Sequence, residues 1–181
     1  METLQQNYDT INLVSSSHDS DVFLVKKKET GERFLLKSLK EQKGVSGEAI
    51  QRKIRFRKEV DTVSSLDHPN IARPAETFAD ETTYSILYPY RRGTTLAKIC
   101  EAKGAITPDE ALLYGQQVLD ALEYVHARGI IHCDLNPNNI YINEERGLEL
   151  LDFGLSMLEE EALKLPENRI VGTMPYISTR S

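Results

Sequence analysis

The N-terminal part of the chain alternates between short apolar runs and polar turns. Residues 8–14 (YDTINLV), 21–27 (DVFLVKK) and 33–39 (RFLLKSL) are rich in β-branched, aromatic and aliphatic side chains, which is typical of strands. The polar segment ETGE at 29–32 separates the last two runs and predicts a hairpin turn. The pattern therefore predicts three consecutive strands, followed by a polar loop at 40–48.

A helical pattern follows between about Gly47 and Ser65. Apolar residues recur there at intervals of three to six positions: Ile50, Ile54, Val60 and Val63. Basic residues fill much of the gap, at positions 52, 53, 55, 57 and 58, and we interpret them as the solvated face. HPNI at 68–71 ends the helix, and two further strands are predicted near 72–79 and 83–88.

The second half of the chain has a mainly helical pattern after the linker PYRRG at 89–93. Thr107 precedes Pro108 and Glu110 in the arrangement of a capping box, which predicts the start of a helix. An apolar stripe then predicts a buried face: Leu112, Val118, Leu119, Leu122 and Val125. Gly129 is expected to end this helix, and two short strands are predicted at 139–143 and 148–152.

Composition narrows the class of protein. Of 181 residues, 40% are hydrophobic and 28% charged, which fits a globular protein, and the net charge of −6 gives no reason to expect a nucleic-acid partner. No apolar run reaches the roughly 18 residues of a membrane span. The N-terminus does not resemble a signal peptide, and the two cysteines lack metal-ligand spacing. We therefore expect a cytoplasmic protein with free thiols.

Two motifs carry the candidate chemistry. HCDLNPNN at 132–139 places Asp134 five residues before Asn139, and DFG at 152–154 places Asp152 just after an apolar strand. Taken singly, such residues are more often turn formers or helix caps. Together they offer a carboxylate that can accept a proton and hard oxygen ligands that suit Mg²⁺.

The pair of motifs resembles the catalytic loop H-R-D-L-x-x-x-N and the D-F-G of the protein kinase family, and the resemblance covers nearly the whole chain. It implies an α+β two-lobe fold. Residues 1–88 would form an N-lobe of five antiparallel strands and one helix, 89–93 the hinge, and 94–181 a partial, mainly helical C-lobe that ends after the activation segment. HCDLNPNNI and GTMPYIS also resemble the kinase modules at the N-terminus of large multidomain sensor histidine kinases.

The resemblance assigns roles to five residues. Asp134 would be the catalytic base, and Lys37 would contact the phosphates of ATP while paired with Glu59. Glu48 is the nearest competing acid, but it precedes the apolar pattern of the helix. Asn139 and Asp152 would bind Mg²⁺.

The nucleotide site implied by the resemblance draws on both halves of the chain. Its members are Ser15, Ser17, Val22, Leu35, Lys37, Pro89, Arg91, Asn139, Tyr141 and Asp152. Pro89 would offer its carbonyl and Arg91 its N–H to adenine, with Tyr88 as gatekeeper. Leu35 would lie above the ring and Tyr141 beneath it, and both are bulkier than usual.

The chain departs from the family pattern at several positions. Aligning Val22 with the family valine puts serines at the three glycine positions of the phosphate-binding loop: Ser15, Ser17 and Ser20. Cys133 replaces the arginine that commonly receives an activation-loop phosphate, and Asn136 replaces a lysine that touches the transferred phosphate. Thr173 in GTMPY nevertheless matches serine/threonine kinases.

Two hypotheses follow. The first is an ATP-dependent serine/threonine kinase core, a fragment of a larger signalling protein, which acts on a protein substrate and has other domains of that sensor as partners. The second is a pseudokinase that binds nucleotide or acts as a scaffold without catalysis. For the 181 residues alone we expect weak or no turnover, because the C-lobe implied by the resemblance is partial.

Overall fold

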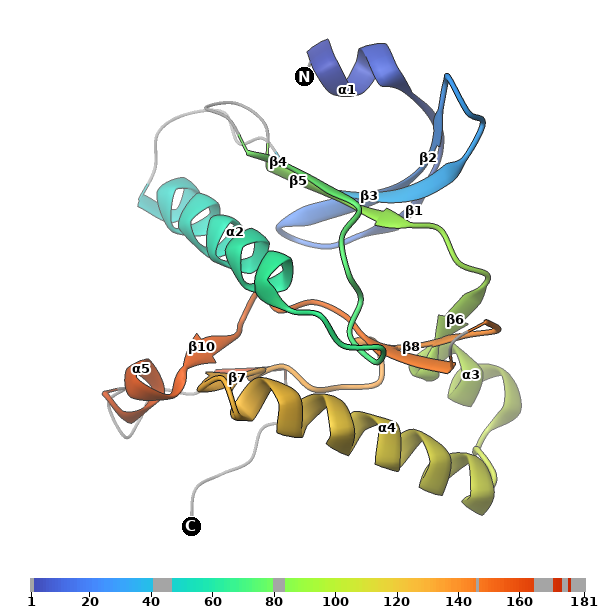
Figure 1. Ribbon diagram of the computed structural model, residues 1–181, viewed down its shortest axis with the longest axis vertical. Helices are drawn as coiled ribbons and strands as arrows, with labels where there is room; N and C mark the ends of the chain where they lie inside the picture. The colour runs from blue at the N-terminus through green and yellow to red at the C-terminus, as the bar shows by residue number, and fades with distance from the viewer. Residues whose placement is uncertain are drawn as a thin grey trace. The chain divides into compact units, whose positions relative to one another are not determined.

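A computed structural model describes residues 2–40, 47–79, 84–145, 147–164, 171–173 and 176. The chain divides into two compact units. The first comprises Met1–Ser64 and Arg73–Tyr90, and the second comprises Ser65–Ala72 and Arg91–Ser181. Figure 1 shows the course of the chain. Most of the predicted loop at 40–48 lies outside the described residues.

The first unit is built on a five-stranded antiparallel sheet of spatial order β1-β2-β3-β5-β4 (Figure 1). Its strands are β1 (Tyr8–Ser16), β2 (Ser20–Lys27), β3 (Arg33–Leu39), β4 (Glu76–Ala79) and β5 (Tyr84–Pro89). The predicted antiparallel sheet is thus confirmed. The fourth strand is shorter than predicted, since it begins at Glu76.

One face of this sheet carries the apolar core of the unit. Val25, Phe34, Leu36 and Leu87 form a buried cluster with Leu4 of the short helix α1 (Glu2–Asn7). Since side chains alternate along a strand, residues at odd positions of β3 lie on the opposite face from Phe34 and Leu36. That opposite face includes Lys37.

Helix α2 (Gly47–Ser65) has the predicted bounds, but its buried face differs from the prediction. The buried residues are Arg52, Phe56, Glu59, Val60 and Val63. Ile50 and Ile54 fit the helical period but are 47% and 54% exposed, and placing Arg52 on the solvated face was wrong. A basic side chain can be buried when an acid from elsewhere in the fold pairs with it, and Asp19 does so here.

The second unit combines short strands with helices. A three-stranded sheet has the order β6-β8-β9, and β10 pairs with β7. The strands are β6 (Gly93–Thr95), β7 (Ile130–Ile131), β8 (Ile140–Asn143), β9 (Gly147–Leu150) and β10 (Met157–Leu158). The helices are α3 (Leu96–Lys103), α4 (Pro108–His126) and α5 (Glu159–Leu163). This arrangement fits a partial, helix-rich kinase lobe.

Helix α4 begins as predicted but buries little of its apolar stripe. Thr107 and Glu110 form the capping box, with Thr107 N–H donating to Glu110 Oε2 over 2.8 Å. Only Ala121 and Val125 are buried, whereas Leu112 and Leu119 are 74% and 66% exposed. The prediction that those two leucines are buried was therefore wrong. No described helix is long and apolar enough to cross a membrane.

Candidate active site

Lys37 and Glu59 form an ion pair in the first unit. Lys37 Nζ lies 2.6 Å from Glu59 Oε1, and the side chains are 14% and 3% exposed. Lys37 is on β3, between Val22 of β2 and Ile86 of β5, while Glu59 comes from α2. The structure thus confirms the pairing expected from the sequence and excludes Glu48 as the partner seen here.

Leu35, which is expected above the adenine ring, shares a sheet face with this lysine. Leu35 lies two residues before Lys37 on β3, so both side chains point to the same side of the sheet. Cross-strand pairing sets Val22 opposite Lys37, and Tyr88 opposite Leu35. An apolar surface beside the buried Lys37 ammonium group suits a nucleotide, because the surface can cover the base while the ammonium group contacts the phosphates.

The turn between β1 and β2 is closed by serine hydroxyls. Ser15 pairs with Val22 across the strands. Ser17 Oγ donates to the carbonyl of Ser20 over 3.0 Å and accepts from the Ser20 N–H over 3.1 Å. Serines therefore shape this turn where the kinase family has glycines, and their hydroxyls are engaged within the turn.

Asp134 lies at the centre of a hydrogen-bonded group in the second unit. Asn139 Nδ2 donates to Asp134 Oδ2 over 3.0 Å and to the Asp134 carbonyl over 2.9 Å. Thr173 Oγ1 donates to the other carboxylate oxygen over 2.5 Å. One oxygen of the carboxylate thus accepts a hydrogen bond from an amide, and the other accepts one from a hydroxyl. A general base must make this second kind of contact with the group that it deprotonates.

Asn136 is folded into the loop rather than extended from it. Its side chain is buried, with Nδ2 donating to the Asp134 carbonyl over 3.1 Å and Oδ1 accepting from the Asn138 N–H over 3.0 Å. The position at which the family carries a lysine therefore shapes the loop here and supplies no positive charge.

His132 anchors the loop to the segment that precedes Asp152. It is buried, its Nε2 lies 3.1 Å from the Leu151 carbonyl, and its Nδ1 accepts from the Asp134 N–H over 3.3 Å. A ring that accepts at Nδ1 carries its proton at Nε2, as in neutral histidine. Burial lowers the pKa of His132 and outweighs the opposing influence of the Leu151 hydrogen bond and of the nearby acids.

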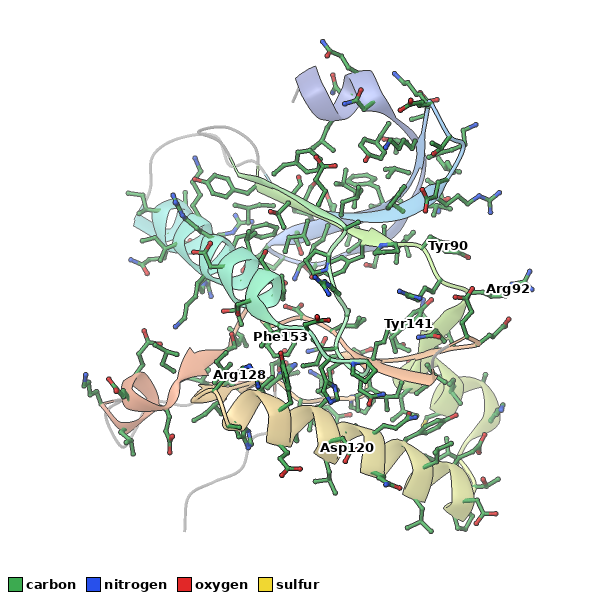
Figure 2. The ribbon with its side chains drawn as sticks, in the orientation of Figure 1. Tyr90, Arg92, Asp120, Arg128, Tyr141 and Phe153 are labelled. Carbon is green, nitrogen blue, oxygen red and sulfur yellow. The ribbon has the colours of Figure 1, made fainter. Side chains whose placement is uncertain are left out.

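Asp152 adopts a left-handed backbone conformation, with φ of 58°. Its Oδ1 accepts from the Gly154 N–H over 3.1 Å, which is a local turn that aspartate and asparagine favour. The preceding residue, Leu151, donates its N–H to the Asn139 carbonyl over 2.8 Å. Phe153, labelled in Figure 2, is 1% exposed, and its ring centroid lies 4.6 Å from that of His132. These contacts fix Asp152 near the catalytic loop.

Asn139 and Asp152 offer oxygen ligands that suit Mg²⁺. Among the described residues, no cluster of three or more His, Cys, Asp or Glu side chains could hold a metal by itself. A carboxylate and an amide on adjoining segments fit an ion that keeps several waters and takes its remaining ligands from phosphates. Asn139 donates from its amide nitrogen to Asp134, so its side-chain oxygen is the atom left to act as an acceptor.

Arg91, which is expected in the hinge, contacts the sheet of the second unit. Tyr141 of β8 donates its hydroxyl to the Arg91 carbonyl over 3.0 Å, and Arg91 Nε lies 3.4 Å from Glu149 Oε1. Figure 2 labels Tyr141 beside this segment. Gly93 follows closely, and a side chain there would overlap the backbone of Ile142. The Tyr141 ring is therefore held in place by its hydroxyl.

Pro89 ends β5 in the first unit, opposite Phe34.

Cys133 replaces the family arginine at a strained backbone position. Its φ is 62°, and its Sγ lies 3.5 Å from the Ile131 carbonyl. A thiol cannot receive a phosphate as arginine does, which agrees with the expected loss of that anchor.

The predicted site residues fall into two groups. The first unit contains Ser15, Ser17, Val22, Leu35, Lys37, Glu59 and Pro89. The second unit contains Arg91, Asp134, Asn139, Tyr141, Asp152 and Thr173. Within each unit the structure brings the key residues together: Lys37 with Glu59, and Asp134 with Asn139 and Thr173. The role of Arg52 in the fold was not predicted, because the sequence does not show which residue pairs with it.

Comparison with known proteins gives a consistent picture. The protein kinase domain model matches residues 8–180. The serine/threonine-protein kinase PrkC of Bacillus subtilis is 33% identical over 124 residues, which cover 68% of this chain and 19% of that protein. The CBL-interacting serine/threonine-protein kinase 3 of Arabidopsis thaliana is 30% identical over 154 residues, which cover 85% of this chain and 34% of the relative.

A human relative extends the comparison beyond bacteria and plants. The 3-phosphoinositide-dependent protein kinase 1 of Homo sapiens is 31% identical over 160 residues, which cover 88% of this chain and 28% of that protein. The matched region thus spans about a fifth to a third of the length of these relatives.

Proposed function

The chain belongs to the protein kinase domain family, and we propose that it is a catalytic core that transfers the γ-phosphate of ATP to serine or threonine hydroxyls of a protein substrate. The observation that carries this proposal is the Asp134 carboxylate. It is oriented by Asn139 and accepts a hydroxyl from Thr173, which is the interaction a substrate hydroxyl would make.

In the proposed reaction, Asp134 accepts the proton of the substrate hydroxyl while the hydroxyl oxygen forms a bond to the γ-phosphorus. The bond from that phosphorus to the β–γ bridging oxygen breaks, and ADP leaves. Asn139 keeps the carboxylate in place during the transfer. Lys37, held by Glu59, would neutralise negative charge on the α- and β-phosphates.

We propose that Asn139 and Asp152 hold Mg²⁺ against the phosphates of ATP. The bound ion would neutralise charge that builds up on the phosphate oxygens. The left-handed conformation of Asp152 and its bond from Gly154 support this assignment, because they fix the direction of a carboxylate that follows a strand. The chain's own contribution is to hold these two side chains on hydrogen-bonded segments.

For the base of ATP, we propose the hinge and the residues that line it. Pro89 would accept through its carbonyl and Arg91 would donate its N–H, and Leu35 and Tyr141 would each contact the ring. The Tyr141 hydroxyl is bonded to Arg91, so the ring is pre-oriented for stacking.

The setting of the protein is also a proposal. The chain spans only part of its relatives' length. A place in a larger signalling protein is proposed, and the apolar surface that Leu112 and Leu119 of α4 expose supports it. Cys100 and Cys133 are not joined in a disulfide, which supports a reducing, cytoplasmic environment.

A second function, a pseudokinase that binds nucleotide without transfer, has two observations in its favour. Serines shape the β1–β2 turn, and Asn136 is folded into the loop where the family has a cation. Loss of that cation removes one charge from the transition-state clamp, which can cost on the order of 100-fold in rate.

A single-turnover assay tests the proposed function. Excess protein is mixed with γ-labelled ATP, Mg²⁺ and a degenerate serine/threonine peptide, because transfer by these residues alone is expected to be slow. We expect label on the peptide, and Asp134→Asn should lower the rate at least about 100-fold. Asp120→Asn on the exposed side of α4 is the matched control (Figure 2). ATP binding with no transfer in any form would favour the pseudokinase.

A further inference from the structure

Arg52 is a buried charged residue of α2, with its side chain 3% exposed, as is that of Glu59. Its Nη2 donates to the carbonyl of Asp19 over 2.9 Å and lies 3.4 Å from that of His18. Its Nε lies 2.7 Å from Asp19 Oδ1. One guanidinium group therefore holds two successive carbonyls and one carboxylate of the turn between β1 and β2, within the first unit.

We call the contacts of Arg52 with His18 and Asp19 the clamp, and Asp19 is its acidic member. Its other carboxylate oxygen lies 3.6 Å from Arg55 Nη2, and its Oδ1 is 2.7 Å from His18 Nδ1. Burial raises the pKa of Asp19, but the His18 hydrogen bond and the charges of Arg52 and Arg55 outweigh it and lower the pKa overall. The carboxylate is therefore ionised wherever the protein is folded near neutral pH.

The other side of the turn is held from the end of β3. Lys40 Nζ donates to the Ser17 carbonyl over 2.6 Å and to Ser16 Oγ over 2.8 Å, and it lies 3.2 Å from Asp21 Oδ1. The turn is thus fixed by side chains from outside itself. A glycine turn would take its shape from backbone freedom, whereas this turn is held by its own Ser17–Ser20 hydrogen bonds and, from outside, by Arg52 and Lys40.

The same helix also holds the catalytic lysine. Arg52 and Glu59 are seven residues apart, which is two turns, so both lie on the buried face of α2. Arg52 holds the β1–β2 turn, and Glu59 holds Lys37. A displacement of α2 would therefore move both phosphate-contacting elements at once.

We propose that Arg52 is a positioning residue for the phosphates of ATP, acting through the clamp with Asp19. It holds the serine-containing turn in the shape that accepts the phosphates and keeps that turn in step with the Lys37–Glu59 pair. This role rests on the proposed function, since it concerns the same nucleotide.

Comparison of ATP with adenosine separates positioning from mere support of the fold. Binding of each is measured by competition against a fluorescent ATP analogue, for the unmodified chain, Arg52→Gln and Asp19→Asn. We expect ATP affinity to fall about 10- to 100-fold in both variants, as misplacement of a binding element does. Adenosine affinity should stay within about twofold of the unmodified chain, because adenosine has no phosphates for the turn to bind. Arg52→Lys should recover part of the loss, and Arg57→Gln, an exposed arginine of the same helix, should change neither affinity.

Asp19→Asn guards against loss of folding, because it releases the clamp from a side chain that is 41% exposed. Amide exchange at residues 16–21 provides a readout that needs no nucleotide, and it should accelerate in both variants. Equal losses for ATP and adenosine, or faster exchange with unchanged ATP affinity, would overturn the positioning role alone. Failure of the unmodified chain to bind ATP would overturn the proposed function, and the positioning role with it.

Discussion

Glu59→Gln removes one charge from the buried ion pair and keeps the shape of the side chain. At the observed 2.6 Å the attraction is about 6 kcal/mol for an effective dielectric constant of about 20. Much of this is offset by the loss of hydration, but removing one partner of a buried pair typically costs about 3–5 kcal/mol, because the other charge stays buried. Lys37 is 14% exposed and can regain some water, so we expect about 3 kcal/mol.

Thermal unfolding followed by circular dichroism measures this loss. For a chain of this length, about 3 kcal/mol corresponds to a fall in Tm of roughly 6–12 °C. Glu48→Gln is the matched control: it removes the same charge from the exposed first turn of α2 and should cost less than about 1 kcal/mol.

A double-mutant cycle with Lys37→Met tests the reasoning itself. Each single change strands a buried charge, so the double variant should be less destabilised than the sum of the two singles. A fall in Tm of less than about 2 °C for Glu59→Gln, or strict additivity in the cycle, would refute the view that the pair is a buried, coupled interaction.

Two further predictions concern stability. Burial lowers the pKa of His132 below the ordinary 6.5, so the unfolded chain binds a proton that the folded chain resists. Its contribution is therefore complete above pH 6.5 and is lost as the pH falls below it; urea unfolding should show this decline, and His132→Gln should flatten it. Gly93→Ala would press a Cβ against the Ile142 carbonyl and should destabilise the second unit by about 1–3 kcal/mol, with a Tm equal to that of the unmodified chain as the contrary result.

Local patterns predicted much of the first unit and the start of α4 in the second, because strand, turn and cap signals there agree with the fold. The three leading strands, the bounds of α2 and the Thr107 capping box all follow from residues close together in the chain. The Lys37–Glu59 pairing was also predicted, but from family resemblance rather than from periodicity.

The errors arose where a distant partner decides burial. Arg52 was assigned to solvent because basic residues usually lie there, yet Asp19, far earlier in the chain, pairs with it and makes burial favourable. Ile50 and Ile54 fit a helical period but are about half exposed. Periodicity shows that a helix has an apolar face; it does not show what covers that face, as Leu112 and Leu119 illustrate.

Very short elements escaped prediction for a related reason. Strands β7 and β10 have two residues each, so they exist only through their pairing with one another. Helix α3 has eight residues, and the sequence alone gave it no distinct start signal, although Thr95 accepts from the Lys98 N–H as its cap. Such elements follow from the tertiary fold rather than from local propensity.

The most direct measurement is the Mg²⁺ dependence of ATP binding, by calorimetry, for the unmodified chain and Asp152→Asn. Asparagine tolerates the φ of 58° and can still accept from the Gly154 N–H, so the variant removes only the charge. We expect Mg²⁺ to strengthen ATP binding at least about tenfold in the unmodified chain and in the control Asp120→Asn, and to have little effect in Asp152→Asn. Equal Mg²⁺ dependence in all three proteins would contradict the assignment of Asp152 as the metal ligand of a kinase site.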